Sequence, residues 1–247
     1  MMNKGIEMEY GKAFTFLTED PDWIKKLGIA AAIVFVAIVG SVFLLIPTIL
    51  GLLLLSGYAV EIARRVINNE VKPLPEWTDF GGLFKNGLFL AIALFVYALP
   101  SIILSVCAQS NSFLPAMLRG NVDRDILEMT QTVTGVLALC CSCLQFIYSI
   151  FMGMVTPAVA GQVASKGTIG AAFDFNAVFG HLRAQPVVYL LVFLITAVAG
   201  FVLALVGLIV CGIGLFVTIP FSVFINAHLW GQAYRFTSSK LAEVPAA

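Results

Sequence analysis

The sequence predicts an all-α polytopic membrane protein with six transmembrane helices. Of its 247 residues, 60% are hydrophobic and 11% are charged, and the mean hydropathy is +0.98, whereas soluble domains carry about 25% charged residues. The apolar stretches lack the period-2 alternation of transmembrane strands, which indicates helices. This composition excludes a soluble enzyme, a disordered chain and a secreted disulfide scaffold.

Long stretches without a charged side chain locate the predicted spans. These stretches are 27–60, 86–118, 129–165 and 184–234. A hydrocarbon core of roughly 30 Å takes about 20 helical residues, so the last stretch must hold two spans and a tight turn. In order, we expect the spans at 28–46, 48–66, 86–107, 131–156, 186–206 and 214–234.

Pro47 is the predicted break between the first two spans, because proline removes a backbone donor and disfavours helix at the preceding residue. We expect 1–247 to form a single integral membrane domain. It would comprise a cytoplasmic interfacial N-terminus 1–27, a six-helix bundle 28–234 with an outer loop at 108–128, and a cytoplasmic tail 235–247.

The distribution of lysine and arginine predicts the orientation. With the N-terminus inside, all 14 of these residues except Arg119 and Arg124 fall in cytoplasmic segments, as the positive-inside rule requires. We therefore expect a multi-pass protein of the cell membrane with both termini cytoplasmic. The first apolar run begins only at Leu27, so we expect no signal peptide and insertion through the first span.

Three inner segments share a pattern that indicates an internal repeat. Each has an Asp followed by an aromatic residue, at Asp22-Trp23, Asp79-Phe80 and Asp174-Phe175, just before an odd-numbered span. The even-numbered spans carry Gly57, Gly161 and Gly231 near their inner ends. We predict three parallel-repeat hairpins, each preceded by an interfacial amphipathic segment in which the Asp caps a helix. The alternative is that such residues are simply common at membrane interfaces.

The stretch Pro73-Leu74-Pro75-Glu76-Trp77-Thr78-Asp79-Phe80-Gly81, with Ala13 to Trp23 and Gly57-Tyr58, resembles the DUF4013 family. Members of that family are uncharacterised multi-spanning proteins of bacteria and archaea. The resemblance covers roughly Phe14 to Tyr234. It implies a membrane protein built of juxtamembrane helices and hairpins, and it implies no activity.

Two groups on the inner side are candidate contacts for a partner or for lipid. Arg64 and Arg65, one helical turn from Glu61, form either a solvated, snorkelling helix end or a contact with anionic lipid. Loop 73–80, which includes Trp77, Asp79 and Phe80, combines prolines, a tryptophan and acidic residues without an evident core role. We expect this loop to be the inner surface that docks a partner.

Asn226, His228 and Gln232 form a candidate polar patch inside the last span. The i,i+4 spacing places His228 and Gln232 on one helical face. The patch either lines a solute path or makes interhelical hydrogen bonds near the interface, and we favour the hydrogen bonds.

No catalytic, cofactor-binding or metal-binding motif stands out. Cys140, Cys141 and Cys143 lie within one span, where small side chains for helix packing explain them better than a metal site, and we expect no disulfide. The absence of charges near the predicted midplanes argues against a proton-coupled carrier and a charged ion filter, and the neutral net charge argues against nucleic acid.

These observations predict a non-enzymatic integral membrane protein without a cofactor, a scaffold or accessory subunit whose partners are membrane lipids or a membrane protein complex. The alternative is a small transporter or permease-like protein for a solute, resting on the repeat and the polar patch. An enzyme acting on lipid is a distant third, because no nucleophile–base pair is evident. The sequence does not fix an oligomeric state.

Overall fold

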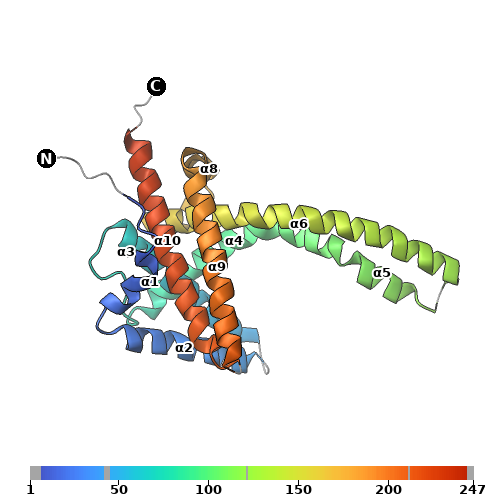
Figure 1. Ribbon diagram of the computed structural model, residues 1–247, viewed down its shortest axis with the longest axis horizontal. Helices are drawn as coiled ribbons and strands as arrows, with labels where there is room; N and C mark the ends of the chain where they lie inside the picture. The colour runs from blue at the N-terminus through green and yellow to red at the C-terminus, as the bar shows by residue number, and fades with distance from the viewer. Residues whose placement is uncertain (1–6, 42–44, 121, 211, 244–247) are drawn as a thin grey trace. The chain divides into compact units, whose positions relative to one another are not determined.

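The computed structural model describes residues 7–41, 45–120, 122–210 and 212–243, and its regular structure there is entirely helical (Figure 1). The long helices are α2 (Trp23–Gly40), α3 (Leu45–Ile67), α4 (Phe80–Ala108), α6 (Arg124–Lys166), α9 (Pro186–Ile209) and α10 (Leu215–Glu243). The short helices are α1 (Lys12–Thr15), the 3-10 helix η1 (Phe16–Glu19), α5 (Ser110–Leu118), α7 (Ile169–Ala172) and α8 (Phe175–Ala184).

Five helices are long and apolar enough to cross a membrane: α2, α3, α4, α6 and α9. Each contains one of the predicted spans or most of it, which indicates a membrane protein. The sixth predicted span, 214–234, lies in α10, which is not among the five, since Asn226, His228 and Gln232 lower its hydropathy. The chain divides into two compact units, one formed by 1–94 with 154–247 and the other by 95–153.

The break between the first two predicted spans lies earlier than the sequence suggested. Helix α2 ends at Gly40 and α3 begins at Leu45, so that Pro47 lies inside the first turn of α3; the prediction that 28–46 forms one span was wrong at this end. The physical reason is that proline is tolerated in a first turn, where its missing N–H would have no partner within the helix.

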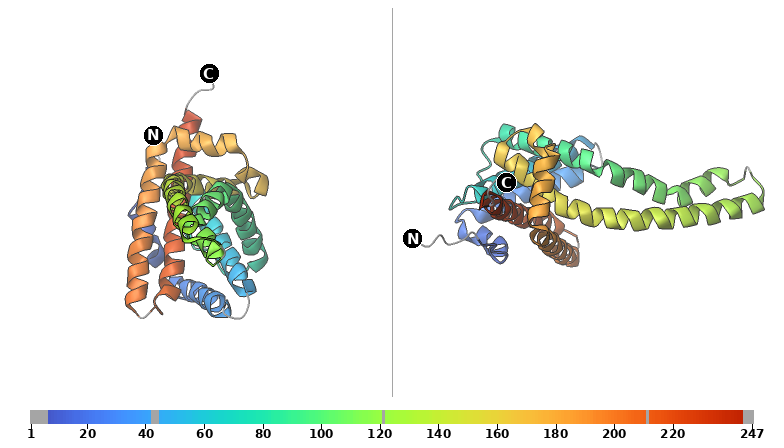
Figure 2. Two further views of the ribbon diagram at one scale, coloured as in Figure 1. Left: turned by 90° about the vertical axis from the view of Figure 1, so that its right-hand side faces the viewer. Right: turned by 90° about the horizontal axis from the view of Figure 1, so that it is seen from above.

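In the first unit, helices α2 and α3 form an antiparallel hairpin, and so do α9 and α10 (Figures 1 and 2). The hydroxyl of Thr48 donates to the Ala37 carbonyl at 2.9 Å, which joins α2 to α3 near their turn. Beyond Ile209 the chain turns at Gly212, whose φ of +77° favours glycine. Pro186 opens α9 at a position that suits proline.

The three glycines of the predicted repeat lie at close helix crossings. A Cβ on Gly57 of α3 would overlap the Leu83 carbonyl of α4, and one on Gly161 of α6 would overlap the Tyr234 ring of α10. A Cβ on Gly231 of α10 would lie 2.7 Å from the Ala63 carbonyl oxygen of α3. Glycine is therefore required at all three positions for the helices to approach.

The aspartates of the repeat cap helices at two of their three positions. Asp79 accepts a hydrogen bond from the Gly82 amide at 2.9 Å, and Asp174 accepts one from the Ala177 amide at 3.0 Å, which confirms capping there. Asp22 makes no such bond, so capping was wrong for the first copy. Helices also precede α2 and α9, whereas 68–79, before α4, is a loop.

The second unit is a hairpin formed by the end of α4, by α5 and by the first part of α6 (Figure 2). The Tyr148 hydroxyl donates to the Tyr97 carbonyl at 2.6 Å. Cys107 and Cys141 form a disulfide between α4 and α6 with a Cα–Cα distance of 6.1 Å, so the expectation of no disulfide was wrong. The pairing depends on how the hairpin folds back, which cysteine spacing does not reveal.

Candidate functional site

Trp77, which we expected at a docking surface, is buried against the rest of the chain. Its side chain is 8% exposed, and its ring stacks on Tyr58 of α3 at a centroid distance of 4.2 Å. Its indole N–H donates to the Lys26 carbonyl at 3.1 Å, while the Tyr58 hydroxyl donates to the Pro75 carbonyl at 2.8 Å. The loop before α4 is thus held on α2 and α3.

A buried lysine completes this attachment. Lys26 and Asp20 are each 3% exposed, and the Lys26 ammonium lies 2.8 Å from Asp20 Oδ2 and 2.6 Å from Glu76 Oε1. It also donates to the Leu74 carbonyl at 3.2 Å. These partners compensate the buried charge of the Lys26 ammonium. An unpaired charge at the same position would strongly destabilise the fold. We call Asp20, Lys26, Tyr58, Glu76 and Trp77 the latch.

The pKa of the Asp20 carboxyl reflects the latch. Burial alone would raise this pKa, but the hydrogen bond from Lys26 and the one from the Asp22 amide outweigh burial and hold it below its usual value. Asp20 is therefore ionised at neutral pH and carries the charge that Lys26 needs. Sequence reasoning missed Asp20 and Lys26; the one available signal was that Lys26 is the last charge before the first apolar run.

Part of the predicted docking loop remains accessible, although Pro73, Leu74 and Pro75 are buried like Trp77. The Asp79 carboxylate caps α4, and Phe80 is 49% exposed, with its ring 6.3 Å from that of Trp77. Glu76, although paired with Lys26, is also exposed. The proposal that this loop docks a partner stays a prediction, and Phe80 and Glu76 are the side chains that such a partner would meet.

Arg64 and Arg65 both bind groups of their own chain. Arg64 pairs with Glu61 and donates to the Ala164 carbonyl of α6 at 2.9 Å. Arg65 lies 3.4 Å from the same glutamate and donates to the Leu74 carbonyl at 3.3 Å. These arginines join α3 to α6 and to the loop before α4, so a contact with lipid or a partner stays a prediction.

The predicted polar patch on α10 is only partly assembled. The Gln232 amide bonds the Glu9 backbone twice, since Oε1 accepts from Glu9 N–H at 2.9 Å and Nε2 donates to its carbonyl at 3.1 Å. Gln232 Nε2 also lies 3.0 Å from His228 Nδ1, and the His228 ring stacks on Phe16 at 4.3 Å. Asn226 takes no part in these bonds, and its Oδ1 is buried without a hydrogen-bond partner among the described residues.

The interhelical hydrogen bonds that we favoured for this patch are not found among the described residues, where Gln232 bonds the N-terminal segment and His228. Gln232 fastens the N-terminal segment onto α10, and the Phe16 ring contacts His228, one helical turn nearer the start of α10. The partner is the N-terminal segment and not another long helix, which the spacing of the two residues could not indicate.

A second histidine, His181 of α8, pairs with the hydroxyl of Ser238 near the end of α10. His181 Nε2 lies 3.1 Å from Ser238 Oγ, and His181 Nδ1 lies 2.8 Å from the Ala177 carbonyl. Burial lowers the pKa of His181, and its ring stacks on Tyr234 at 4.6 Å. The sequence had revealed no base–hydroxyl pair. This pair joins α8 to α10, and its imidazole ring is packed against Tyr234.

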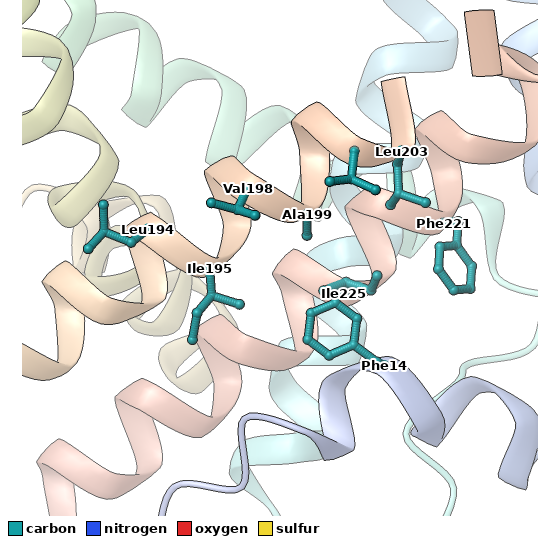
Figure 3. Close-up of a pocket in the computed structure, with 9 residues that line it drawn as sticks. Phe14, Leu194, Ile195, Val198, Ala199, Leu203, Phe221 and Ile225 are labelled. Carbon is teal, nitrogen blue, oxygen red and sulfur yellow. The ribbon is translucent and has the colours of Figure 1, made fainter. Parts of the chain in front are cut away.

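An apolar groove runs along α9 and α10 (Figure 3). Its volume is about 500 Å³. Phe14 of α1, which is 43% exposed, reaches across beside Ile225 at one edge. The lining consists of Phe14, Leu194, Ile195, Val198, Ala199, Val202, Leu203, Phe221 and Ile225. A groove of this composition suits a hydrocarbon chain.

The described residues define an all-helical protein whose apolar helices indicate a membrane location. The family model described as "Protein of unknown function (DUF4013)" matches residues 40–212, and the chain belongs to this family. The resemblance carried by the stretch from Pro73 to Gly81 is thereby confirmed, over a shorter range than Phe14 to Tyr234. None of the curated proteins and none of the solved structures that were compared matches the chain.

Proposed function

We propose that this protein is a non-enzymatic integral membrane protein that binds lipid in the apolar groove and serves as a scaffold or accessory subunit of a membrane complex. In this proposal the six long helices α2, α3, α4, α6, α9 and α10 are the spans. Both termini lie in the cytoplasm, and the protein resides in the cell membrane. The groove on α9 and α10 is the observation that carries the lipid-binding part.

Helix directions within the first unit support the proposed topology. On α3 and α10, the contact of Tyr58 with Phe224 is followed, further along both helices, by that of Val66 with Gly231. The two helices therefore run the same way, as even-numbered spans of a parallel repeat should.

The chemistry of the groove favours an acyl chain as its occupant. Its lining is aliphatic and aromatic, and α9 is the most apolar of the candidate spans. In a bilayer, burying apolar surface provides little driving force, because lipid tails are as apolar as leucine. Whether an acyl chain prefers this groove therefore depends on the shape of the groove. Phe14, which lies at one edge, adds a contact surface that two packed helices alone would not provide.

The contacts on the inner side support a scaffold role. The latch, Arg64, Arg65 and Gln232 tie the N-terminal segment and the loop before α4 to the helices. The same contacts leave Phe80 exposed. A rigid inner face with an exposed ring suits the docking of a partner better than it suits a moving gate.

A small transporter is the second candidate. It rests on Asn226, whose Oδ1 is buried in α10 without a hydrogen-bond partner in the described ranges. A polar atom of this kind inside a span is costly, and it is often retained for function. Saturable uptake of a solute into liposomes that contain the protein, above empty liposomes, would favour this candidate over a scaffold.

Filling the groove tests lipid binding. Val198→Trp places an indole in the groove, whereas Val206→Trp adds the same side chain to an exposed position of α9 outside it. Native mass spectrometry of the protein released from detergent should show that wild type and Val206→Trp keep a phospholipid adduct that Val198→Trp loses. Equal adducts in all three proteins would contradict lipid binding in the groove.

A further inference from the structure

A polar pocket lies on the first unit between the N-terminal segment, the end of α3 and α10, and it shares no lining residue with the apolar groove. Its volume is about 300 Å³, at the lower end of the range of roughly 300–1,000 Å³ for small-molecule sites. We call it the inner polar pocket. Its polar and charged lining residues are Glu7, Glu9, Lys12, Glu19, Asn69, Glu70, His228, Gln232 and Arg235.

Carboxylates outnumber cations in this lining by four to two. Glu9 pairs with Lys12 at 3.8 Å, and Glu70 lies 3.8 Å from Arg65 outside the pocket. Glu7 and Glu19 form no ion pair with the described part of the chain. Two carboxylates are therefore available for a positively charged group.

His228 presents a hydrogen-bond donor that the fold does not use. The two bonds to the Glu9 backbone fix the orientation of the Gln232 amide, so its Nε2 must donate to His228 Nδ1. The proton of the neutral imidazole then lies on Nε2, for which no acceptor is found within the described residues. His228 is 3% exposed and lines the pocket.

Arg235 adds a cation without an acidic partner among the described residues. Its guanidinium donates to the Val66 carbonyl at 3.3 Å and to the Asn69 side-chain oxygen, both of which are neutral. Its Nε is buried and has no acceptor in the described ranges. The pocket thus combines donors and a positive charge from α10 with free carboxylates from the N-terminal segment.

We infer that the inner polar pocket binds a small zwitterion that carries an ammonium and a carboxylate, of the size of a basic amino acid. The carboxylate meets His228 Nε2–H and Arg235, while the ammonium meets Glu7 and Glu19. A simple anion would face the four carboxylates, and a simple amine would leave the donor of His228 unpaired. The excess of negative charge favours a ligand with a second ammonium group.

Isothermal titration of the purified full chain with L-lysine tests this inference. We expect saturable binding of L-lysine, and much weaker binding of n-butylamine and of pentanoate, each of which carries only one of the two groups. Glu19→Gln should weaken L-lysine binding by about tenfold or more, because hydrogen bonds to charged groups contribute most. Glu19 is exposed, so this change should leave the fold intact.

Two further variants complete the design. Arg235→Gln should weaken L-lysine at least as much as Glu19→Gln, and its melting temperature shows whether the helix packing survives. Arg183→Gln, at an exposed arginine outside the pocket, should bind L-lysine as wild type does. Absence of saturable L-lysine binding, or equal binding by wild type and Glu19→Gln, overturns the inference. Neither result bears on phospholipid adducts at the groove.

Discussion

At the scale of single residues, the latch is the most informative feature of this protein. Lys26 is buried, yet it is joined to two carboxylates and a carbonyl. Its partners come from the segment before α2 and from the loop before α4, so one side chain connects three parts of the chain. A buried charge is tolerated only with such a set of partners.

Removing one partner of the buried Asp20–Lys26 ion pair should lower the stability of the protein. Lys26→Ala leaves the Asp20 carboxylate buried and unpaired, and we expect a loss of about 3–5 kcal/mol in the free energy of unfolding. Thermal or denaturant unfolding in detergent measures it. The double variant Asp20→Asn/Lys26→Met removes both charges and should recover part of the loss. If Lys26→Ala unfolds as wild type does, Asp20 and Lys26 are not a buried pair.

The stability of the protein should depend on pH through Asp20. Its pKa is lower in the folded protein than its unfolded value of about 3.9. The resulting stabilisation is present above the unfolded pKa and is lost as pH falls through the folded pKa. Between pH 5 and pH 3, wild type should therefore lose more stability than Asp20→Asn. If the free energy of unfolding fell equally with pH in the two proteins, Asp20 would not be the source of this pH dependence.

A neutral hydrogen bond of the latch should contribute less. Tyr58→Phe removes the bond to the Pro75 carbonyl while the ring can still stack on Trp77. We expect a loss of roughly 0.5–1.5 kcal/mol, measured in the same unfolding experiment. Tyr10→Phe is the control, because no hydrogen bond of the Tyr10 hydroxyl is found with the described residues. A loss as large as that of Lys26→Ala would be inconsistent with a single neutral bond.

At the scale of helices, glycine sets how closely the elements pack. Gly57 and Gly87 let α3 and α4 approach until each Cα lies against the backbone of the other helix. The sequence marked Gly57, Gly161 and Gly231 as a shared pattern, but their role as three crossing points follows only from the coordinates. The pattern is local, whereas the partner at each crossing comes from a distant helix.

Gly57→Ala should separate α3 from α4. A methyl group there overlaps the Leu83 backbone, which cannot move aside as a side chain can, so we expect a loss of at least about 1–3 kcal/mol. Gly28→Ala is the matched control, since a Cβ on Gly28 meets nothing within 4 Å. Equal melting temperatures for the two variants would show that α3 and α4 do not cross at Gly57.

Helix positions could be predicted because length and hydropathy are local properties. The misplaced break at Pro47 shows the limit of a rule that treats proline as a helix end without considering the first turn. The latch and the disulfide could not be predicted, because Asp20, Lys26 and Glu76, like Cys107 and Cys141, meet only when separate elements fold together. Trp77 was predicted to lie at a docking surface, and its burial against Tyr58 was not foreseen.

At the scale of the whole molecule, we propose that the chain meets lipid along its long helices and the cytoplasm at both ends. Five helices have the required length and apolarity, and the proposal adds α10 as the sixth span. The even number of spans places both termini on one side. The apolar groove, the inner polar pocket and the exposed Phe80 all take their proposed environments from this topology.

Accessibility of introduced cysteines on intact cells tests this topology most directly. In a background with Cys140, Cys143 and Cys211 replaced by Ser, a membrane-impermeant maleimide should label Asp123→Cys, in the proposed outer loop. Glu243→Cys, near the C-terminus, should react only after the cells are permeabilised. Labelling of Glu243→Cys on intact cells, or protection of Asp123→Cys until permeabilisation, would contradict the six-span arrangement with cytoplasmic termini.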